Sequence, residues 1–131
     1  MAANFLSQRD SGIQAMKHLE SIAQEVVVTF IHRQYPQALF TGGLAGERLS
    51  MGAAVRRKRM GYRAGTPDLI VWEARKGSSG LAIEMKAPEG GKVSPEQKAF
   101  LEALQARNWT TAVCHGSREA IEVIRAYMDA K

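Results

Sequence analysis

The sequence predicts an α/β fold in which a mixed central sheet is flanked by helices. Three observations support this fold: helical apolar periodicity near both ends of the chain, short runs with strand character between them, and turn residues that separate those runs. With 131 residues and 45% hydrophobic content, the chain is long enough to bury one core. It has no repeat, low-complexity tract or linker, so we expect one domain over residues 1–131, with residues 1–10 as a candidate disordered start.

The first half of the chain predicts a helix, a short strand and a basic helical segment. Between Ile13 and Tyr35 apolar residues recur every three or four positions, which indicates a helix with one buried stripe. That stripe comprises Leu19, Ile22, Ala23, Val26, Val27 and Phe30. Pro36 ends this helix, and the run QALFTGG predicts a brief strand that enters a loop. Residues 47–60 predict an arginine-rich helix that Gly52 interrupts or frays.

The second half predicts two strands, a helix, a strand and a last helix. The stretch GTPDLIVWEARKGSSGLAIEMKA, residues 65–87, contains two apolar runs joined by a polar turn. Ser94, followed by Pro95 and then Gln97, marks a helix start, and the helix should extend to about Arg107. The run TTAVCH predicts a strand, and SREAIEVIRAYMDA returns to helical periodicity. The expected order is therefore α, β, basic segment, β, β, α, β, α.

Composition favours a polyanionic partner and a reducing compartment. Lysine and arginine number 18 against 13 acidic residues, and the sequence pI is about 9.7. The single cysteine, Cys114, excludes an intramolecular disulfide and a cysteine-rich zinc site, and its apolar strand predicts a buried, inert thiol. No apolar run approaches the roughly 20 residues that a membrane span needs. We therefore expect a cytoplasmic protein without a membrane partner.

Acidic residues interrupt both apolar runs of residues 65–87. If the two strands pair antiparallel around the turn between them, Asp68 lies opposite Glu84, and period-two alternation places Lys86 on the same face. The intervening Ile83 and Met85 then point into the core. Two opposed carboxylates repel each other unless a cation lies between them, and oxygen ligands at this spacing suit Mg²⁺ or Mn²⁺.

These residues carry a resemblance to a known family. Pro67-Asp68, followed at sixteen residues by Glu84-Met85-Lys86, resembles the PD-(D/E)XK nuclease signature. The surroundings resemble one branch, the VRR-NUC (virus-type replication-repair nuclease) family, in three segments: Gly61…Gly65-Thr66-Pro67-Asp68-Leu69, Gly80-Leu81-Ala82-Ile83-Glu84-Met85-Lys86 and Ser94-Pro95-Glu96-Gln97. The resemblance implies a restriction-endonuclease-like core and a metal-dependent DNA endonuclease. It also implies the stand-alone type that phages and bacteria carry, and hence the cytoplasm of a bacterium or a phage-infected host.

The resemblance implies catalytic and metal-binding roles for the hairpin residues. Asp68 and Glu84 would bind Mg²⁺ or Mn²⁺ directly, with the Met85 carbonyl as a further ligand. Lys86 would orient or help to deprotonate the attacking water, or stabilise the pentavalent phosphate. Gln97 resembles the catalytic glutamine that the family places on the next helix, although a glutamine at this position also completes a helix cap.

The family also places an acid of the first helix in the metal site. Glu25, eleven residues before Pro36, matches the family spacing best. At about 100° per residue it lies about 60° from Ile22, on one shoulder of the expected stripe. Glu20 occupies the opposite shoulder, and both side chains could reach the sheet.

A cluster of basic residues precedes Asp68. Residues 46–65 hold six lysine and arginine residues against the single acid Glu47, a net charge of +5 that equals that of the whole chain. We expect this cluster, together with Lys92, to hold DNA phosphates without reading bases. The expected DNA-binding residues are Arg48, Arg56, Arg57, Lys58, Arg59, Arg63 and Lys92.

Stand-alone members of the family resemble Holliday-junction resolvases and act as homodimers. The resemblance therefore implies that a homodimer cuts branched DNA such as four-way junctions, a role in DNA repair. The loop Thr41-Gly42-Gly43 departs from the asparagine-glycine pair that is common in the family. Two alternatives stay open: a non-catalytic DNA-binding module of the same fold, and a structural accessory protein of a phage or repair assembly.

Overall fold

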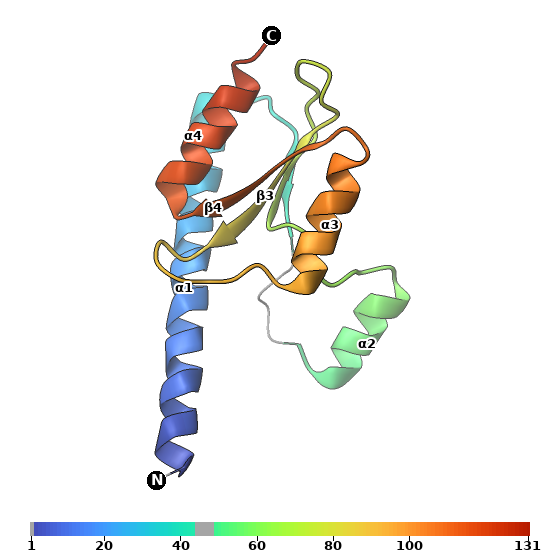
Figure 1. Cartoon of the computed structure of the whole chain (residues 1–131). Coiled ribbons are helices and arrows are strands. Elements are labelled where there is room, and N and C mark those ends of the chain that lie inside the picture. The colour runs from blue at the N-terminus through green and yellow to red at the C-terminus, as the bar shows by residue number, and fades with distance from the viewer. Residues whose placement is uncertain (1, 44–48) are drawn as a thin grey trace.

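The computed structural model describes residues 2–43 and 49–131, with side chains from residue 11 onward (Figure 1). The elements follow the predicted order. They are α1 (Ala2–Gln34), β1 (Phe40–Gly42), α2 (Met51–Arg59), β2 (Leu69–Val71), β3 (Leu81–Lys86), α3 (Pro95–Gln105), β4 (Thr110–His115) and α4 (Ser117–Met128). Arg48, one of the expected DNA-binding residues, lies outside the described residues.

The strands form one mixed sheet, as predicted. Their spatial order is β1-β2-β3-β4, in which β2 pairs antiparallel with both β1 and β3, whereas β3 and β4 are parallel. Helices α1 and α4 pack together on one face of the sheet, and α3 covers the other face (Figure 1). Helix α2 lies in the connection between β1 and β2 and stands apart from the sheet (Figure 1).

The β2–β3 pair has the register that the sequence predicts. The paired residues are Leu69 with Ile83, Ile70 with Ala82, and Val71 with Leu81. One further step along the same register places Asp68, which directly precedes β2, opposite Glu84. The turn between the strands closes with a bridge between Arg75 and Ser78, so it is centred where the sequence indicates.

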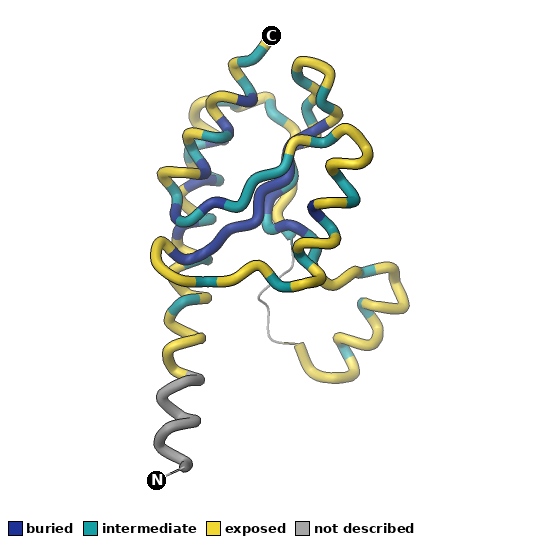
Figure 2. The backbone as a smooth tube through the Cα atoms, viewed as in Figure 1, coloured by how far each residue is buried: buried dark blue, intermediate teal, exposed yellow. Residues whose placement is uncertain are grey.

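Strand β3 is buried along its whole length, and Figure 2 shows it as the darkest part of the chain. One of its faces packs into an apolar core that includes Val27, Ile31, Ile83, Met85, Cys114 and Ile124. The other face carries Glu84 and Lys86, which are only 2% and 7% exposed. Charged groups that are buried in a central strand need partners, so this second face must supply them.

Helix α1 differs from the prediction in its length and in its buried face. It begins at Ala2 rather than near Ile13. Its buried residues are Ala23, Val27 and Ile31. The predicted stripe was wrong for three residues that are 50%, 45% and 46% exposed: Leu19, Ile22 and Val26. Two neighbouring rows of apolar residues run along this helix, and the predicted stripe combined residues of both. Only one row packs on the sheet.

Helix α2 is shorter than predicted. It begins after Ser50, whose hydroxyl accepts a hydrogen bond from the Ala53 amide at 3.2 Å. Gly52 lies in its first turn without interrupting it. None of its residues is buried. Arg56, Lys58 and Arg59 are exposed, whereas Arg57 is half-buried. Among the described helices of the chain, none combines the length and apolar content needed to cross a membrane.

Candidate active site

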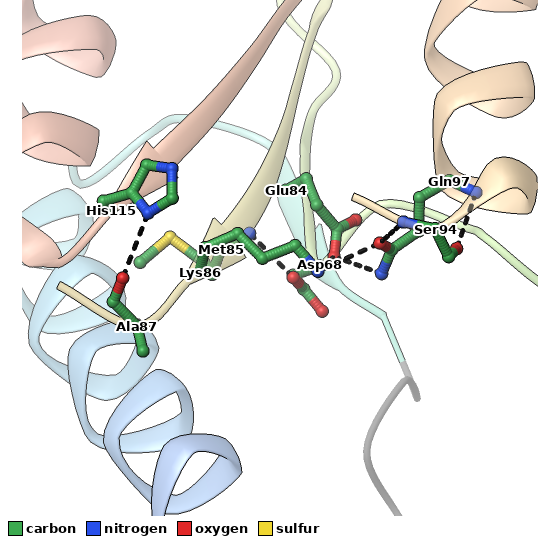
Figure 3. A network of polar contacts seen from close by, with 8 residues as sticks. All are labelled: Asp68, Glu84, Met85, Lys86, Ala87, Ser94, Gln97 and His115. Carbon is green, nitrogen blue, oxygen red and sulfur yellow. Dashed lines mark hydrogen bonds and ion pairs between the residues drawn. The ribbon is translucent and has the colours of Figure 1, made fainter. Parts of the chain in front are cut away.

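One cleft of about 290 Å³ gathers the hairpin residues that the sequence singles out. Asp68, Glu84 and Lys86 reach it from the β2–β3 pair, and Gln97 reaches it from the first turn of α3 (Figure 3). Helix α1 forms the opposite wall, where Glu20 faces the cleft. Elements far apart in sequence therefore bring acidic, basic and amide groups to one place.

Asp68 is held in place on both its backbone and its side chain. Its Oδ2 accepts a hydrogen bond from the Met85 amide at 2.7 Å (Figure 3). Its carbonyl oxygen accepts from the Gly43 amide at 2.8 Å and from Gln24 Nε2 at 3.2 Å. Because the amide and carbonyl of a residue in an extended strand point to the same side, the Met85 carbonyl also faces the Asp68 side of β3.

Glu84 is the most deeply buried charged residue of the cleft. Its Oε1 accepts a hydrogen bond from Gln97 Nε2 at 2.8 Å and lies 3.7 Å from Lys86 Nζ. Its Oε2 is buried and has no hydrogen-bond partner among the described residues. Burial, and then the neighbouring Asp68 carboxylate, raise the pKa of Glu84 to about 9, against the smaller lowering effect of Lys86. The single positive charge of Lys86 therefore does not offset the burial of Glu84 and the second carboxylate beside it.

Gln97 completes the helix cap and also contacts the two buried charged residues of β3. As a capping residue, its Oε1 accepts from the Ser94 amide at 2.9 Å, while its own amide donates to Ser94 Oγ at 3.1 Å. The same Oε1 accepts from Lys86 Nζ at 2.9 Å (Figure 3). The cap of α3 thus fixes an amide group between Lys86 and Glu84.

The structure places Glu20, and not Glu25, in the cleft. Glu25 is exposed and lines a separate hollow with Val28 and Thr29. The reason is the orientation of α1: Glu20 lies about 20° around the helix from buried Val27, whereas Glu25 lies about 160° from it. The preference for Glu25 depended on the family spacing, and the expected apolar stripe could not correct it because that stripe included Ile22, which is exposed.

Five further residues of α1 line the cleft and were not predicted as site residues, among them Lys17 and Gln24. Lys17 and Gln24 lie three residues before and four residues after Glu20, so all three share one face of the helix. That spacing is the signal that could have identified them. It becomes informative only once Glu20 is known to face the sheet.

The residues of the cleft fit a divalent metal ion of the hard, oxygen-binding type. An ion between Asp68 and Glu84 would satisfy the unpaired Oε2 and relieve the repulsion that raises the pKa of Glu84. The described residues contain no group of three or more histidine, cysteine, aspartate or glutamate side chains that could hold a metal, so Glu20 does not complete such a group. Magnesium commonly binds one or two carboxylates and completes its coordination with water and substrate phosphate.

The expected DNA-binding residues fall into two groups. Lys92 lines the cleft itself. The residues of α2 lie outside it, on the helix that stands apart from the sheet: Arg56, Arg57, Lys58 and Arg59. Arg63 follows this helix, and its guanidinium lies 5.6 Å from the centre of the Phe100 ring on α3. The basic residues therefore form an extension of the site rather than part of its floor.

The three histidines and the single cysteine lie outside the cleft. His18 and His32 are exposed, and His115 Nδ1 lies 3.1 Å from the Ala87 carbonyl oxygen (Figure 3). Cys114 is buried, as predicted, and burial raises the pKa of its thiol to about 11. This thiol is therefore not a nucleophile at neutral pH.

Comparisons with known proteins agree with this geometry. The family model of the VRR-NUC domain matches residues 19–118. A solved structure described as a VRR_NUC domain protein is 30% identical and superposes with a TM-score of 0.73, over 84% of this chain and 88% of that one. No curated protein gives a significant match. The matched region contains the cleft residues from Glu20 to Gln97, and the predicted α/β fold is confirmed by the solved structure. The chain therefore belongs to the VRR-NUC family of nuclease domains.

Proposed function

We propose that the chain is a Mg²⁺- or Mn²⁺-dependent endodeoxyribonuclease that hydrolyses phosphodiester bonds with water. Membership of the VRR-NUC family implies nuclease activity and DNA as the substrate. The observation that carries the metal-dependent chemistry is the meeting of Asp68 and Glu84 in one cleft, where Glu84 Oε2 is buried without a partner. A binding module would gain nothing from a buried acid in β3 that faces a second, repelling acid before β2.

The two acids are the proposed metal ligands. Asp68 and Glu84 would hold the ion with the Met85 carbonyl, and Glu20, rather than Glu25, would face the ion from α1 across the cleft without binding it directly. A bound divalent ion supplies a more acidic water and neutralises negative charge on the phosphate. The protein holds these oxygens in position beforehand, since Asp68 is anchored to Met85 and to Gln24.

Lys86 and Gln97 are the proposed partners of the reacting groups. A lysine ammonium has three donor positions, and Lys86 uses one on Gln97 Oε1. Another can point into the cleft, toward the attacking water or toward a phosphate oxygen in the transition state. Gln97 would orient both Lys86 and Glu84, because it accepts a hydrogen bond from the first and donates one to the second.

A cleavage assay tests this function. Linear, flap and four-way DNA should be cut only when Mg²⁺ or Mn²⁺ is present, and Glu84→Ala should abolish cleavage while the protein stays folded and still binds DNA. Glu102→Ala, which changes an exposed acid of α3 outside the cleft, is the matched control and should cut normally. Full activity of Glu84→Ala would end the nuclease assignment, and metal-independent binding without cleavage would favour the DNA-binding module.

Selection of branched DNA by a homodimer is the finer part of the proposal. Two copies related by a twofold axis would place two clefts for paired cuts in a four-way junction. The exposed apolar row of α1 supports an interface between copies, since Leu19, Ile22 and Val26 remain about half exposed along one side of the helix. Helix α2 supports the binding of a large DNA substrate, because its basic residues lie outside the cleft and could contact DNA beyond it.

Sedimentation tests the homodimer, which should have about twice the chain mass of 14.4 kDa. Ile22→Glu should convert it to a monomer, whereas Leu39→Glu, at an exposed site outside α1, should not. Four-way junctions should outcompete linear duplex of equal length, and an excess of Asp68→Ala protein should give heterodimers that nick only one strand. A monomer that cuts linear and branched DNA equally would refute this part alone.

A further inference from the structure

The loop between β3 and α3 leaves the sheet beside helix α1 and runs to the start of α3 (Figure 1), and its residues Gly91 and Lys92 line the cleft. Gly90 and Gly91 have φ values of +80° and +78°, a left-handed backbone that favours glycine. A Cβ atom at Gly91 would lie 3.4 Å from Lys86 Cδ, and one at Gly90 would lie 3.4 Å from Met16 Cε. The double glycine therefore brings this loop close to both the proposed catalytic lysine and α1.

Two lysines reach the cleft from opposite elements, the loop and the helix. Lys92 directly follows the double glycine, and Lys17 lies one turn before Glu20 on α1. Neither ammonium group has a hydrogen bond or an ion pair with any described residue, in contrast to Lys86. Both side chains are exposed, so they lie at the mouth of the cleft while the acids lie deeper.

The backbone of the loop offers donors at the same place. Gly91 and Lys92 line the cleft, and their amides have no hydrogen-bond acceptor among the described residues. Backbone amides without an acceptor in the protein remain available to an anion. Amide donors and lysine ammonium groups together match a phosphate, which offers several acceptor oxygens and a negative charge.

We propose that the Lys17 and Lys92 side chains and the amides of Gly91 and Lys92 clamp one phosphate of the cleaved strand next to the phosphate being cut. The inference rests on the proposed nuclease function and extends it to one defined backbone position. The clamp would set which phosphodiester lies against Asp68 and Glu84. The α2 residues differ from it, because they are outside the cleft and would hold the DNA backbone without fixing its register.

Single neutral phosphates in the substrate test this clamp. A DNA strand with a mapped cut site is prepared as a series in which one phosphate at a time is a methylphosphonate. For wild-type protein, one position beside the cut should raise KM by about 10-fold, the size expected for one charge-assisted contact. Lys17→Gln and Lys92→Gln should each raise KM on normal DNA, with little change in kcat, and arginine at either position should restore most of the loss.

The combination of protein and DNA changes decides the outcome. In the Lys17→Gln/Lys92→Gln protein, a methylphosphonate at the sensitive position should not raise KM any further. Methylphosphonates at the other positions should change KM as much as they do for the wild type. Lys98→Gln changes an exposed lysine of α3 outside the cleft and should keep the full wild-type sensitivity. The clamp would be refuted if the KM increases caused by the double variant and by the methylphosphonate added together at every position. It would also be refuted if the Lys98→Gln protein behaved like the double variant.

Binding measurements separate this inference from the proposed function. Fluorescence anisotropy with the same DNA series needs no cleavage. If wild-type protein cuts no DNA with Mg²⁺ or Mn²⁺, the proposed nuclease function is wrong. The clamp is tested separately: one methylphosphonate should weaken DNA binding by the wild type but not by the double variant, and equal weakening of both would refute it.

Discussion

Replacing Glu84 by glutamine should stabilise the metal-free protein at alkaline pH and remove its response to magnesium. Burial and the Asp68 carboxylate raise the pKa of Glu84 from 4.5 to about 9 in the folded protein. Between these two values the folded protein keeps a proton that the unfolded chain has released. The free energy of unfolding therefore falls as pH rises through this window, by up to about 1.4 kcal/mol per pH unit, and this loss is absent at more acidic pH.

Glutamine keeps the shape of the side chain and an oxygen that can accept from Gln97 Nε2, but it has no charge to bury. The assay is urea denaturation in EDTA at about pH 6 and about pH 8, followed by the fluorescence of Trp72 and Trp109, whose rings meet edge to face at 5.5 Å. Between these conditions the wild type should lose up to about 3 kcal/mol relative to Glu84→Gln, or roughly 10 °C in Tm for a chain of this size. Glu102→Gln should follow the wild type.

Magnesium should reverse this trend in the wild type. An ion that binds only the folded state stabilises it by about 2.7 kcal/mol at a hundredfold excess over Kd. Because the ion competes with the proton of the acid pair, its effect should grow from about pH 6 to about pH 8. Glu84→Gln should gain little at either pH. Equal stabilisation of both proteins by magnesium, or a wild type that does not weaken relative to the variant, would refute the reasoning.

The other predictions concern the basic helix, the cap of α3 and the loop over the cleft. Changing the four basic residues Arg56–Arg59 to glutamine should weaken binding of all DNA sequences alike. The slope of log binding constant against log salt concentration should fall in magnitude by about 0.9 for each lost phosphate contact. An unchanged slope in a salt titration would mean that α2 does not touch DNA. Gln97→Ala and Ser94→Ala should each lower the free energy of unfolding by about 1 kcal/mol through loss of the helix cap. Only Gln97→Ala should also lower kcat, because it removes the contacts to Lys86 and Glu84. Equal activity of the two variants would show that Gln97 is a capping residue alone. Gly91→Ala and Gly77→Ala place a Cβ at nearly the same positive φ and should cost similar stability, whereas only Gly91→Ala meets the stem of Lys86 and should reduce cleavage.

The parts of the site that depend on local geometry could be predicted from the sequence. The turn position and period-two alternation fix the register of β2 and β3, and they place Asp68 opposite Glu84 before any tertiary contact is known. The capping box of α3 is equally local, since it needs only Ser94 and Gln97 at the right spacing. The second task of Gln97 could not be read in this way, because Lys86 and Glu84 meet it only when α3 packs on the sheet.

The orientation of α1 could not be predicted, because its apolar residues form two rows and spacing does not say which row meets the sheet. The packed row contains Ala23 and Val27, and this choice turns Glu20 toward the cleft and Glu25 away from it. The same rotation leaves Ile22 about 160° around the helix from Glu20. One face of α1 therefore serves the cleft while nearly the opposite face stays apolar and accessible. A second copy of the chain on that face would bury the exposed row without closing the cleft to DNA, so the proposed homodimer and the proposed catalysis use separate sides of one helix.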